Sequence, residues 1–381
     1  MKKYRAILLT VFLLGGVLGC TGETEAKPQD QTAASADAPE SAAAGGGNDE
    51  TAGEEAAGEI SASSEDNPEP VTFTMYFVDP DSSPYVQGGC RISELVSEAT
   101  EGRIRIDVVG SSEMGERELV EGAMDNTVDI ATCANSVLTN YIPQMNILDQ
   151  AYLWENADEA HAAVDGALGE LIAERALTLG LHVLGFEESG FRNTFSTKPI
   201  DSIEDFAGIT IRTMENKYHQ AAFKAFGAEP VAMPYPEVLD ALKNGEINAC
   251  ENATVNCLNS GYYVITKHVT DTQHAFTYIL LLMSDEAWER IPENLREPFM
   301  EAVRQGVEWE RDELVRANDS VTEELKKLGV EFHDIDTSVL KEAYRNIAEE
   351  KGFTFDPEWV SAVDDAVREA ASMNSGSSDA A

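Results

Sequence analysis

Strand-like and helix-like hydrophobic patterns alternate along the first part of the folded chain. The segment VTFTMYFV, residues 71–78, is apolar enough for a buried strand, and turn-forming residues follow it. Apolar residues then recur at helical spacing from Val86 to Thr100, and this pattern stops before Gly102. Residues 103–109 alternate as a second strand.

The same alternation continues to about residue 250. The segment ERELVEGAMDN, residues 116–126, has a helical pattern, and VDIATCA, residues 128–134, reads as another buried strand. Strands and helices in this order favour an α/β fold with parallel strands.

A long helical pattern dominates the C-terminal third of the chain. It runs from Pro292 to Leu328 and is closed by Gly329, with Pro298 near its start as a kink or a fresh first turn. Even a helix that began at Pro298 would be more than about 40 Å long at the usual rise per residue. A helix of that length most simply braces two lobes.

The first twenty residues predict a lipid anchor. Lys2, Lys3 and Arg5 precede an apolar run that is too short to span a bilayer and that ends in small residues. The run closes with VLGC, which resembles the lipobox of bacterial lipoproteins and implies cleavage before Cys20 and acylation of its thiol. The alternative is an ordinary secretory signal with an incidental cysteine. No later segment approaches about 18 consecutive apolar residues, so we expect the mature chain to be anchored to the membrane and not to span it.

Residues 21–70 predict a disordered acidic tether. They contain no aromatic residue and one large aliphatic residue, Ile60, among many Ala, Gly, Ser and acidic residues. Such a segment cannot bury enough apolar surface to offset the entropy lost on ordering. The globular part therefore starts near Val71 and has about 300 residues, enough for two lobes.

The charge of the chain restricts its partners. The formal net charge is −42 at pH 7, which argues against nucleic acid as a partner and favours a soluble surface. A site that binds anions would have to be a locally positive pocket inside this negative surface.

The cysteines and histidines leave several readings open. Outside the cytoplasm the four cysteines after Cys20 could form two disulfides, and two of them, Cys250 and Cys257, are close in sequence; free buried thiols fit equally well. We find no Cys/His spacing suited to zinc and expect no metal or cofactor. Polar surroundings predict that His161, His219 and His333 lie at the surface. We expect His268 and His274 to have structural roles.

An arginine stands at the end of a short buried strand in GITIRTMEN, residues 208–216. The β-branched Ile209 and Ile211 precede Arg212, so its guanidinium is expected to be partly buried. A buried guanidinium without a partner is very costly, so Arg212 must meet an anion from the chain or from elsewhere.

The sequence around Arg212 resembles the solute-binding proteins of tripartite ATP-independent periplasmic (TRAP) transporters, the DctP-like family. The matching motifs are GFRN, EDFAGITIR, FGAEPVAMPYPEV, ALKNGEINACEN and KHVTDTQH, in that order. Residues 110–143 and the segment SDEAWERIPENLREPFMEA also resemble the family, and the resemblance covers nearly all of residues 71–350. Several motifs in order at sensible spacing are far more specific than any single motif.

The resemblance implies a carboxylate-binding role for two arginines. In the family, the arginine at the position of Arg212 pairs with a carboxylate of the bound solute, and a guanidinium fork meets a carboxylate in bidentate fashion. The alternative is that Arg212 pairs with a neighbouring acidic residue. Arg192, in GFRN, matches a second arginine near the ligand, and its alternative role is to brace the crossover between lobes.

Three further ligand-binding residues are predicted, two from the resemblance and one from its place after a strand. Asn252, in CENAT, matches the asparagine of a family turn, although Ala253 replaces the usual proline and Cys250 a usual glycine. Tyr235 occupies an aromatic position that packs on ligands in the family, where plain core packing is the alternative. Asn135 follows a predicted strand on a loop that should face the cleft.

The resemblance also implies the architecture. The expected fold is α/β, two-lobed and periplasmic-binding-protein-like, with a hinge between the lobes and a long helix bracing both. After the signal peptide (residues 1–20) and the tether, we expect two lobes and a tail. Lobe I should comprise residues 71–189 and 278–317, and lobe II residues 190–277 and 318–365. Residues 366–381 should form a disordered tail.

The predicted function is that of a monomeric, lipid-anchored extracytoplasmic receptor and not an enzyme. It would capture a small organic acid, a sugar acid or a dicarboxylate, and deliver it to the small and large subunits of a TRAP membrane permease. A sensing receptor is one alternative. A secreted lipoprotein hydrolase is another, but no motif for a catalytic nucleophile or metal occurs in the chain.

Overall fold

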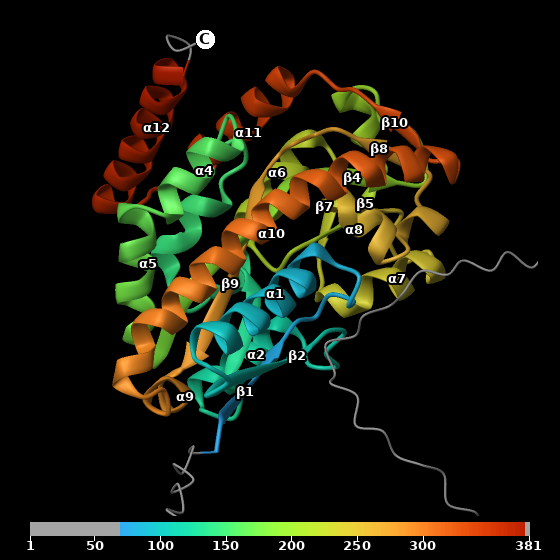
Figure 1. Cartoon of the computed structure of the whole chain (residues 1–381). Helices are drawn as coiled ribbons and strands as arrows, with labels where there is room; N and C mark the ends of the chain where they lie inside the picture. Colours follow the sequence, from blue (N-terminus) through green and yellow to red (C-terminus); the bar gives the residue numbers. More distant parts are fainter. Residues whose placement is uncertain (1–68, 378–381) are drawn as a thin grey trace, which may run out of the picture. The chain divides into compact units, whose positions relative to one another are not determined.

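The computed structural model of the chain describes residues 69–377 (Figure 1). The predicted signal peptide, the lipobox Cys20 and nearly all of the predicted tether lie outside the described residues. A bilayer-spanning helix is absent from residues 69–377, because every helix there is too short or too polar.

The described residues form mixed helices and strands in alternating order. The strands are β1 (Val71–Tyr76), β2 (Ile104–Val109), β3 (Ile130–Ala134), β4 (Leu181–Ser196), β5 (Thr210–Thr213), β6 (Glu229–Ala232), β7 (Ala249–Ala253), β8 (His268–Thr270), β9 (Phe276–Ser284) and β10 (Glu331–His333). The helices are α1 (Pro84–Ala99), α2 (Glu116–Met124), α3 (Asn135–Leu138), α4 (Ala157–Val164), α5 (Ala167–Leu177), α6 (Lys217–Phe226), α7 (Val238–Asn244), α8 (Thr254–Asn259), α9 (Asp285–Glu289), α10 (Glu293–Lys327), α11 (Thr337–Lys351) and α12 (Pro357–Ser377). Four short 3-10 helices complete the set: η1 (Pro143–Asp149), η2 (Ile203–Phe206), η3 (Tyr235–Glu237) and η4 (Tyr262–Val264).

The strands form one continuous sheet in the order β2-β1-β3-β9-β4-β7-β5-β6, with β8 paired to β4 and β10 paired to β8. The predicted parallel pairing is confirmed for β1 with β2 and β3, and for β5 with β6 and β7. It is wrong at the centre, where β9 and β4 run antiparallel to their neighbours. β9 is buried at every position, so its sequence shows the continuous apolar run typical of a parallel strand and hides its direction.

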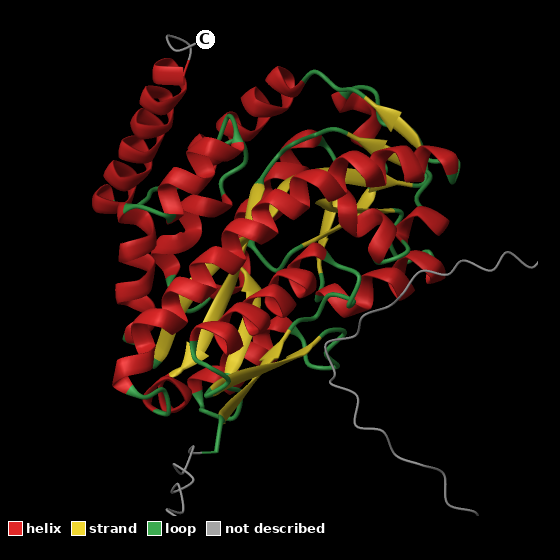
Figure 2. Cartoon of the chain, in the orientation of Figure 1, coloured by secondary structure: helices red, strands yellow, loops and turns green. Residues whose placement is uncertain are grey.

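β4 joins the two halves of the sheet. Its first part, from Leu181 to Phe191, pairs with β9, and its last part, from Arg192 to Ser196, pairs with β7. Helices cover both faces of the sheet (Figure 2). One strand therefore carries the chain from one half of the α/β fold into the other, as a two-lobed fold requires.

The predicted long helix is confirmed as α10. It has 35 residues, or about 50 Å, and it follows Pro292 and ends just before Gly329, whose φ of 80° allows the chain to leave the helix. Pro298 lies in its second turn, where little of the hydrogen-bond ladder is lost. α10 packs against α1 in the first half and against α8 in the second, so it contacts both halves of the fold (Figure 1).

Two expectations about single segments, for the C-terminal tail and for His219, are wrong, and the open choice between disulfides and free thiols is decided for three cysteines. Residues 366–377 belong to α12 and are not a disordered tail, because Ala366 and Ala370 are buried in the core shared with α4 and α5. Cys133, Cys250 and Cys257 are free buried thiols, so neither Cys250–Cys257 nor Cys90–Cys133 is a disulfide. His219, expected at the surface, is only 3% exposed, because it lies on the inner face of α6.

Two glutamates are buried together between α1, β4 and α10. Glu187 and Glu310 are both 0% exposed, and neither carboxylate oxygen of Glu187 has a hydrogen-bond partner among the described residues. Glu310 accepts one hydrogen bond at 2.8 Å from the backbone nitrogen of Glu188. A Cβ on Gly88 would lie 2.3 Å from Glu187 Oε1 and 2.7 Å from Glu310 Cγ, so only glycine lets α1 approach this pair. Burial, and then repulsion from Glu310, raises the pKa of Glu187 well above its usual value; burial also raises that of Glu310.

This pair makes stability depend on pH. The unfolded chain releases the Glu187 proton near the ordinary pKa of 4.5, whereas the folded chain keeps it to higher pH, so the free energy of unfolding falls as pH rises above 4.5. We expect Glu187→Gln, which mimics the protonated acid, to stabilise the protein by about 1 kcal/mol or more at pH 8 and by less at pH 5. Denaturant unfolding at the two pH values measures this, with Glu297→Gln on the exposed face of α10 as the control. A gain that is absent at pH 8 would mean that burial does not raise the pKa of Glu187 in the folded protein.

Candidate functional site

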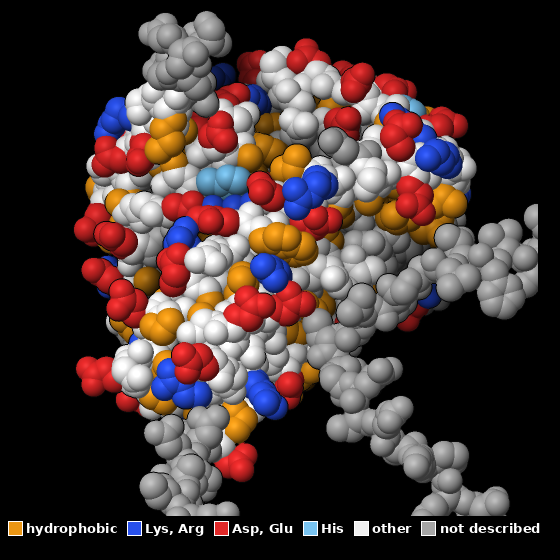
Figure 3. All heavy atoms as spheres, in the orientation of Figure 1, with side chains coloured by type: hydrophobic (Ala, Val, Ile, Leu, Met, Phe, Trp, Pro, Cys, Tyr) orange, Lys and Arg blue, Asp and Glu red, His pale blue; other side chains and the backbone are white. Residues whose placement is uncertain are grey.

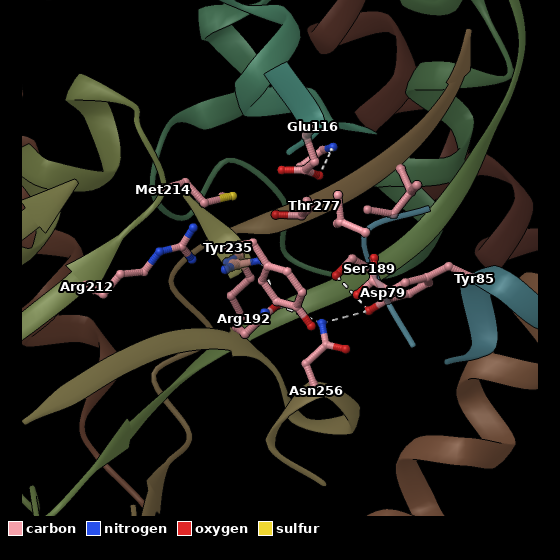
Figure 4. Close-up of a pocket in the computed structure, with 14 residues that line it drawn as sticks. Asp79, Tyr85, Glu116, Ser189, Arg192, Arg212, Met214, Tyr235, Asn256 and Thr277 are labelled. Atoms are coloured by element: carbon pink, nitrogen blue, oxygen red, sulfur yellow. Dashed lines mark hydrogen bonds between the residues drawn. The ribbon is translucent and has the colours of Figure 1, made fainter. Parts of the chain in front are cut away.

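A small cavity lies where the two halves of the sheet meet (Figure 4). Its lining comes from both halves and from the crossing strands β4 and β9. The lining residues are Val78, Asp79, Tyr85, Glu116, Ala134, Ser189, Arg192, Arg212, Met214, Tyr235, Asn252, Asn256, Thr277 and Ile279.

Arg192 is fixed in the cavity wall by residues of the neighbouring strand. β4 and β7 pair so that Arg192 lies beside Ala253. Its Nε donates to Glu251 Oε2 at 2.5 Å, and its terminal nitrogens donate to the Glu251 carbonyl at 2.7 Å and to Asn252 Oδ1 at 2.9 Å. The guanidinium is 3% exposed and Glu251 is 0% exposed, so this is a buried ion pair with matched hydrogen bonds.

Glu251 is held as a carboxylate by two partners. His274 Nε2 lies 3.3 Å from its Oε2. Burial alone would raise the pKa of Glu251, but the charge of Arg192 and the hydrogen bonds from His274 and Arg192 outweigh it and hold the pKa well below its usual value. The positive charge of Arg192 is therefore balanced within the protein.

Arg212 is buried with less compensation. It lies on β5, its Nε donates to the Met233 carbonyl at 2.8 Å, and it is 4% exposed. Its terminal nitrogens donate no hydrogen bond to any residue within 69–377, and Nη1 lies 3.9 Å from Glu251 Oε1, an acid already bonded to Arg192. Figure 4 shows its guanidinium reaching from β5 toward Met214. The free donors of Arg212 face the cavity, where an anion can meet them in bidentate fashion.

Hydroxyl and amide groups line the wall beside Arg192. Asn252 Oδ1 accepts from Asn256 Nδ2 at 3.0 Å, and Asn256 Nδ2 also lies 3.3 Å from the Tyr85 hydroxyl. That hydroxyl shares a hydrogen bond of 3.0 Å with Ser189. Asn256 Oδ1 is buried without a partner among the described residues, as is the Thr277 hydroxyl. Buried polar atoms of this kind are usually satisfied by water or a ligand.

Two acidic residues in the lining, Asp79 and Glu116, partly offset the positive charge of the arginines. Burial, and then the nearby Glu116, raises the pKa of Asp79 to about 7, so near neutral pH it is only partly ionised. Burial raises the pKa of Glu116 as well, although the backbone nitrogen of Ala134 donates to it at 2.8 Å and both arginines attract it. The cavity can thus be close to neutral when empty and still favour an added anion beside Arg212.

A second, larger hollow adjoins the cavity and shares Glu116, Arg212, Met214 and Tyr235 with it. Arg117 and Glu215 line this hollow and form an ion pair of 3.9 Å across it; their side chains are 42% and 40% exposed. Arg212 therefore lines both the small cavity and the larger hollow beside it.

The structure places four of the five predicted binding residues in the cavity lining: Arg212, Arg192, Asn252 and Tyr235. Tyr235 is partly buried, and its hydroxyl shares a hydrogen bond of 2.6 Å with Ser260. Asn135 is not in the lining. Its amide nitrogen donates to Asp149 at 2.9 Å and its oxygen accepts from the backbone nitrogen of Tyr278 at 3.0 Å, so its side chain ties η1 to β9.

Several lining residues were not predicted from the sequence. Asp79 follows β1 and Glu116 begins α2, so both lie at a strand or helix end that faces the cleft, and this position could have identified them. Ser189, Asn256 and Thr277 carry no local signal, because only the pairing of distant strands brings them to the cavity.

The Arg192–Glu251 pair yields a stability prediction. We expect Glu251→Gln to lower the free energy of unfolding by about 3–5 kcal/mol at pH 7, because it leaves a buried guanidinium without its counter-charge. The folded-state pKa is depressed, so the loss relative to wild type should shrink as pH falls below the ordinary 4.5. Denaturant titrations of wild type and Glu251→Gln, at pH 7 and at a pH below 4.5, measure the two losses. The control is Glu229→Gln, in an exposed pair with Lys224, where a change under about 1 kcal/mol is expected. Equal losses in the two variants would refute the importance of the buried pair.

Comparisons with known proteins agree with this geometry. Residues 76–352 match the model of the family described as bacterial extracellular solute-binding protein, family 7. A solute-binding protein of Verminephrobacter eiseniae is 30% identical over 218 residues, which are 57% of this chain and 65% of that protein. The 2,3-diketo-L-gulonate-binding periplasmic protein of Escherichia coli is 25% identical over 67% of this chain and 79% of its own.

A solved structure has the same fold. The TRAP periplasmic solute-binding protein of Polaromonas sp. JS666, crystallised with D-erythronate, has a TM-score of 0.73 and 27% identity over 77% of this chain and 98% of its own. The family model covers more than half of the sequence, and the two-lobed α/β fold agrees with it. This chain therefore belongs to family 7 of the bacterial extracellular solute-binding proteins, the solute-binding proteins of TRAP transporters.

Proposed function

We propose that this chain binds a small sugar acid in the cavity and passes it to the membrane subunits of a TRAP transporter. The observation that carries the proposal is Arg212, a buried guanidinium whose terminal nitrogens face the cavity and donate no hydrogen bond within the described residues. A carboxylate would satisfy these donors and balance the charge.

The rest of the lining favours hydroxyl groups on the same ligand. Asn256 Oδ1 and the Thr277 hydroxyl lack partners among the described residues, and Ser189 and Tyr85 offer two more hydroxyls. Each can bond to a sugar hydroxyl. The relatives named for 2,3-diketo-L-gulonate and D-erythronate also bind polyhydroxylated carboxylates.

A role in solute binding is favoured over hydrolysis. The serine in the cavity, Ser189, shares a hydrogen bond with Tyr85 and with no histidine, so a nucleophile–base pair is not found among the lining residues. Genes for small and large membrane subunits beside this gene would support transport, and their absence would support sensing.

The proposed lobes follow the limits expected from the family. Lobe I would comprise 71–189 and 278–317, and lobe II would comprise 190–277 and 318–365, with the chain crossing between them in β4, near the start of β9 and in α10. The cavity would then open and close as the lobes move about these crossings. A second structure in an open conformation would test the limits, because the lobes should each superpose while the crossings bend.

The central test concerns Arg212. We expect Arg212→Ala to weaken binding of the acid by about 2–5 kcal/mol, because the carboxylate then enters the cavity without its partner. Arg212→Lys keeps the charge but loses the fork, so it should bind more weakly than wild type and better than alanine. Thermal-shift screening of sugar acids, with D-erythronate and 2,3-diketo-L-gulonate among them, identifies the ligand, and calorimetric titration then ranks the variants.

Two controls make this test decisive. Arg304→Ala, on the exposed side of α10, should leave affinity unchanged. Erythritol, which lacks the carboxylate of D-erythronate, should bind wild type and Arg212→Ala equally poorly. A neutral analogue that binds wild type as tightly as the acid does, or an alanine variant with wild-type affinity, would show that Arg212 does not bind a carboxylate.

The proposed lipid anchor has its own test. We propose that the protein is held at the outer side of a membrane by acylation of Cys20 and acts as a monomer. Cys20→Ser should release a soluble protein whose affinity for the acid is unchanged, because the cysteine lies far along the sequence from the site. Detergent phase partitioning reports the anchor. Wild-type protein that enters the aqueous phase as completely as the variant would contradict acylation.

A further inference from the structure

Two histidines and a glutamate meet at the outer edge of the sheet, in the half that carries β5 and β7. β8 and β10 pair in parallel, with Glu331 beside His268 and His333 beside Thr270 (Figure 1). His268 and His333 are separated by 65 positions in the sequence, so only this pairing brings them together. The cluster belongs to neither the cavity nor the hollow beside it.

The three side chains point ligand atoms at one place. His268 Nδ1 lies 3.0 Å from His333 Nε2 and 3.7 Å from Glu331 Oε2, and the three ligand atoms all lie within 4.8 Å of one another. Ligands about 2.0–2.1 Å from a tetrahedral zinc ion are separated by about 3.3 Å. The separations of 3.0 and 3.7 Å lie on either side of that value, so the three side chains are spaced as ligands of one ion could be.

A fourth residue orients one of the histidines. His333 Nδ1 lies 2.7 Å from Asp201 Oδ1. A carboxylate only accepts, so Nδ1 carries the proton and donates, and Nε2 faces the cluster, where its lone pair can bind an ion. A carboxylate that fixes the second nitrogen of a histidine in this way is the usual support of a metal ligand.

His268 can supply the second lone pair. Without an ion, its Nδ1 donates to His333 Nε2. Moving that proton to Nε2 of the same ring frees Nδ1 for a metal at no cost in net charge.

We propose that His268, His333 and Glu331 bind Zn²⁺, with Asp201 orienting His333. Two imidazoles and a carboxylate are a usual zinc ligand set, and three protein ligands leave a fourth position for water. The histidine side chains are 16% and 12% exposed and Glu331 is 71% exposed, so an ion can enter from solvent. Acidic side chains are spread over the surface of this protein, which raises the local concentration of cations (Figure 3).

A second group of possible ligands is a poorer site. His219, Glu251 and His274 also lie within 4.8 Å of one another, but all three are buried. Glu251 is bonded to Arg192, and Arg212 lies 3.9 Å from its other oxygen. A dication there would face two guanidiniums, so the charge that suits an anion in the cavity excludes a metal beside it.

The zinc site would act as a staple between distant segments. β10 follows the C-terminal end of α10 and precedes α11, whereas β8 is paired to the crossover strand β4. An ion held by residues from both would tie the end of the long helix to the strand that joins the two halves of the sheet. Binding to the folded chain alone would stabilise it in proportion to the logarithm of the zinc concentration above Kd.

The test uses the purified full chain, freed of metal with a chelator. Zn²⁺ competition against a chromophoric chelator and Co²⁺ absorption give the affinity and the geometry, and melting with and without Zn²⁺ gives the stabilisation. We expect one equivalent of Zn²⁺, a visible Co²⁺ band typical of tetrahedral coordination, and a higher melting temperature. His333→Gln and His268→Gln should lose all three signals, and Asp201→Asn should weaken binding by about 10–100-fold.

Two further variants make the result specific. Glu331→Gln changes an exposed side chain, so it cannot be mistaken for unfolding, and it should also weaken Zn²⁺ binding. His182→Gln removes a histidine that pairs with Asp285 elsewhere, and it should leave binding unchanged. Absence of a stoichiometric zinc equivalent at tens of micromolar metal would overturn the proposal. So would binding that persists in His333→Gln, or that is lost in His274→Gln and not in His333→Gln.

Discussion

The ion pair between Arg192 and Glu251 is the interaction on which the rest of the site depends. It joins β4, the strand that crosses between the halves of the sheet, to β7, whose end supplies Asn252. Both side chains are almost fully buried, so the pair is tolerable only because three hydrogen bonds and His274 accompany it. Because the Arg192 guanidinium and the Glu251 carboxylate bind each other, this wall of the cavity is already in place before a ligand binds. A site with such a fixed wall is preorganised.

The position of the pair also explains why Arg212 is available. Arg212 lies close enough to Glu251 to be attracted by it, at 3.9 Å, but too far for a hydrogen bond. Glu251 has a single negative charge, and Arg192 holds it more closely. The second guanidinium is therefore left with Glu116 as a nearby acid, and burial raises the pKa of that carboxyl. A protein with a net charge of −42 thus keeps a site where one further negative charge is favourable.

Sequence patterns predicted the elements better than their pairing. Residues 71–78, 103–109 and 292–328 form strands and a helix close to their predicted limits, because hydrophobic period and capping residues are local signals. The antiparallel direction of β9 left no trace in its sequence, since a strand buried on both faces is apolar throughout whichever way it runs. The end of α12 was missed because its buried alanines are small and its other residues are those of a polar tail.

The same holds for the site: some of its residues can be identified from their neighbours in the sequence, and others only from partners on distant strands or helices. Arg212 could be identified because its strand and its neighbours are contiguous in sequence. Asn135 has a similar local setting, directly after a buried strand, yet it faces Asp149 and Tyr278. His219 and His333 both stand among polar residues, but one is buried against Asp149 and the other lies beside His268. What separates these residues is the partner that a distant strand or helix presents, and no window of sequence contains both members of such a pair. A charged or polar residue therefore acquires its role from the fold. Arg192 and Arg212 are both arginines on strands beside Glu251, but Arg192 is close enough to form a hydrogen bond with Glu251 and Arg212 is not. This difference in position leaves Arg212 free to bind a ligand.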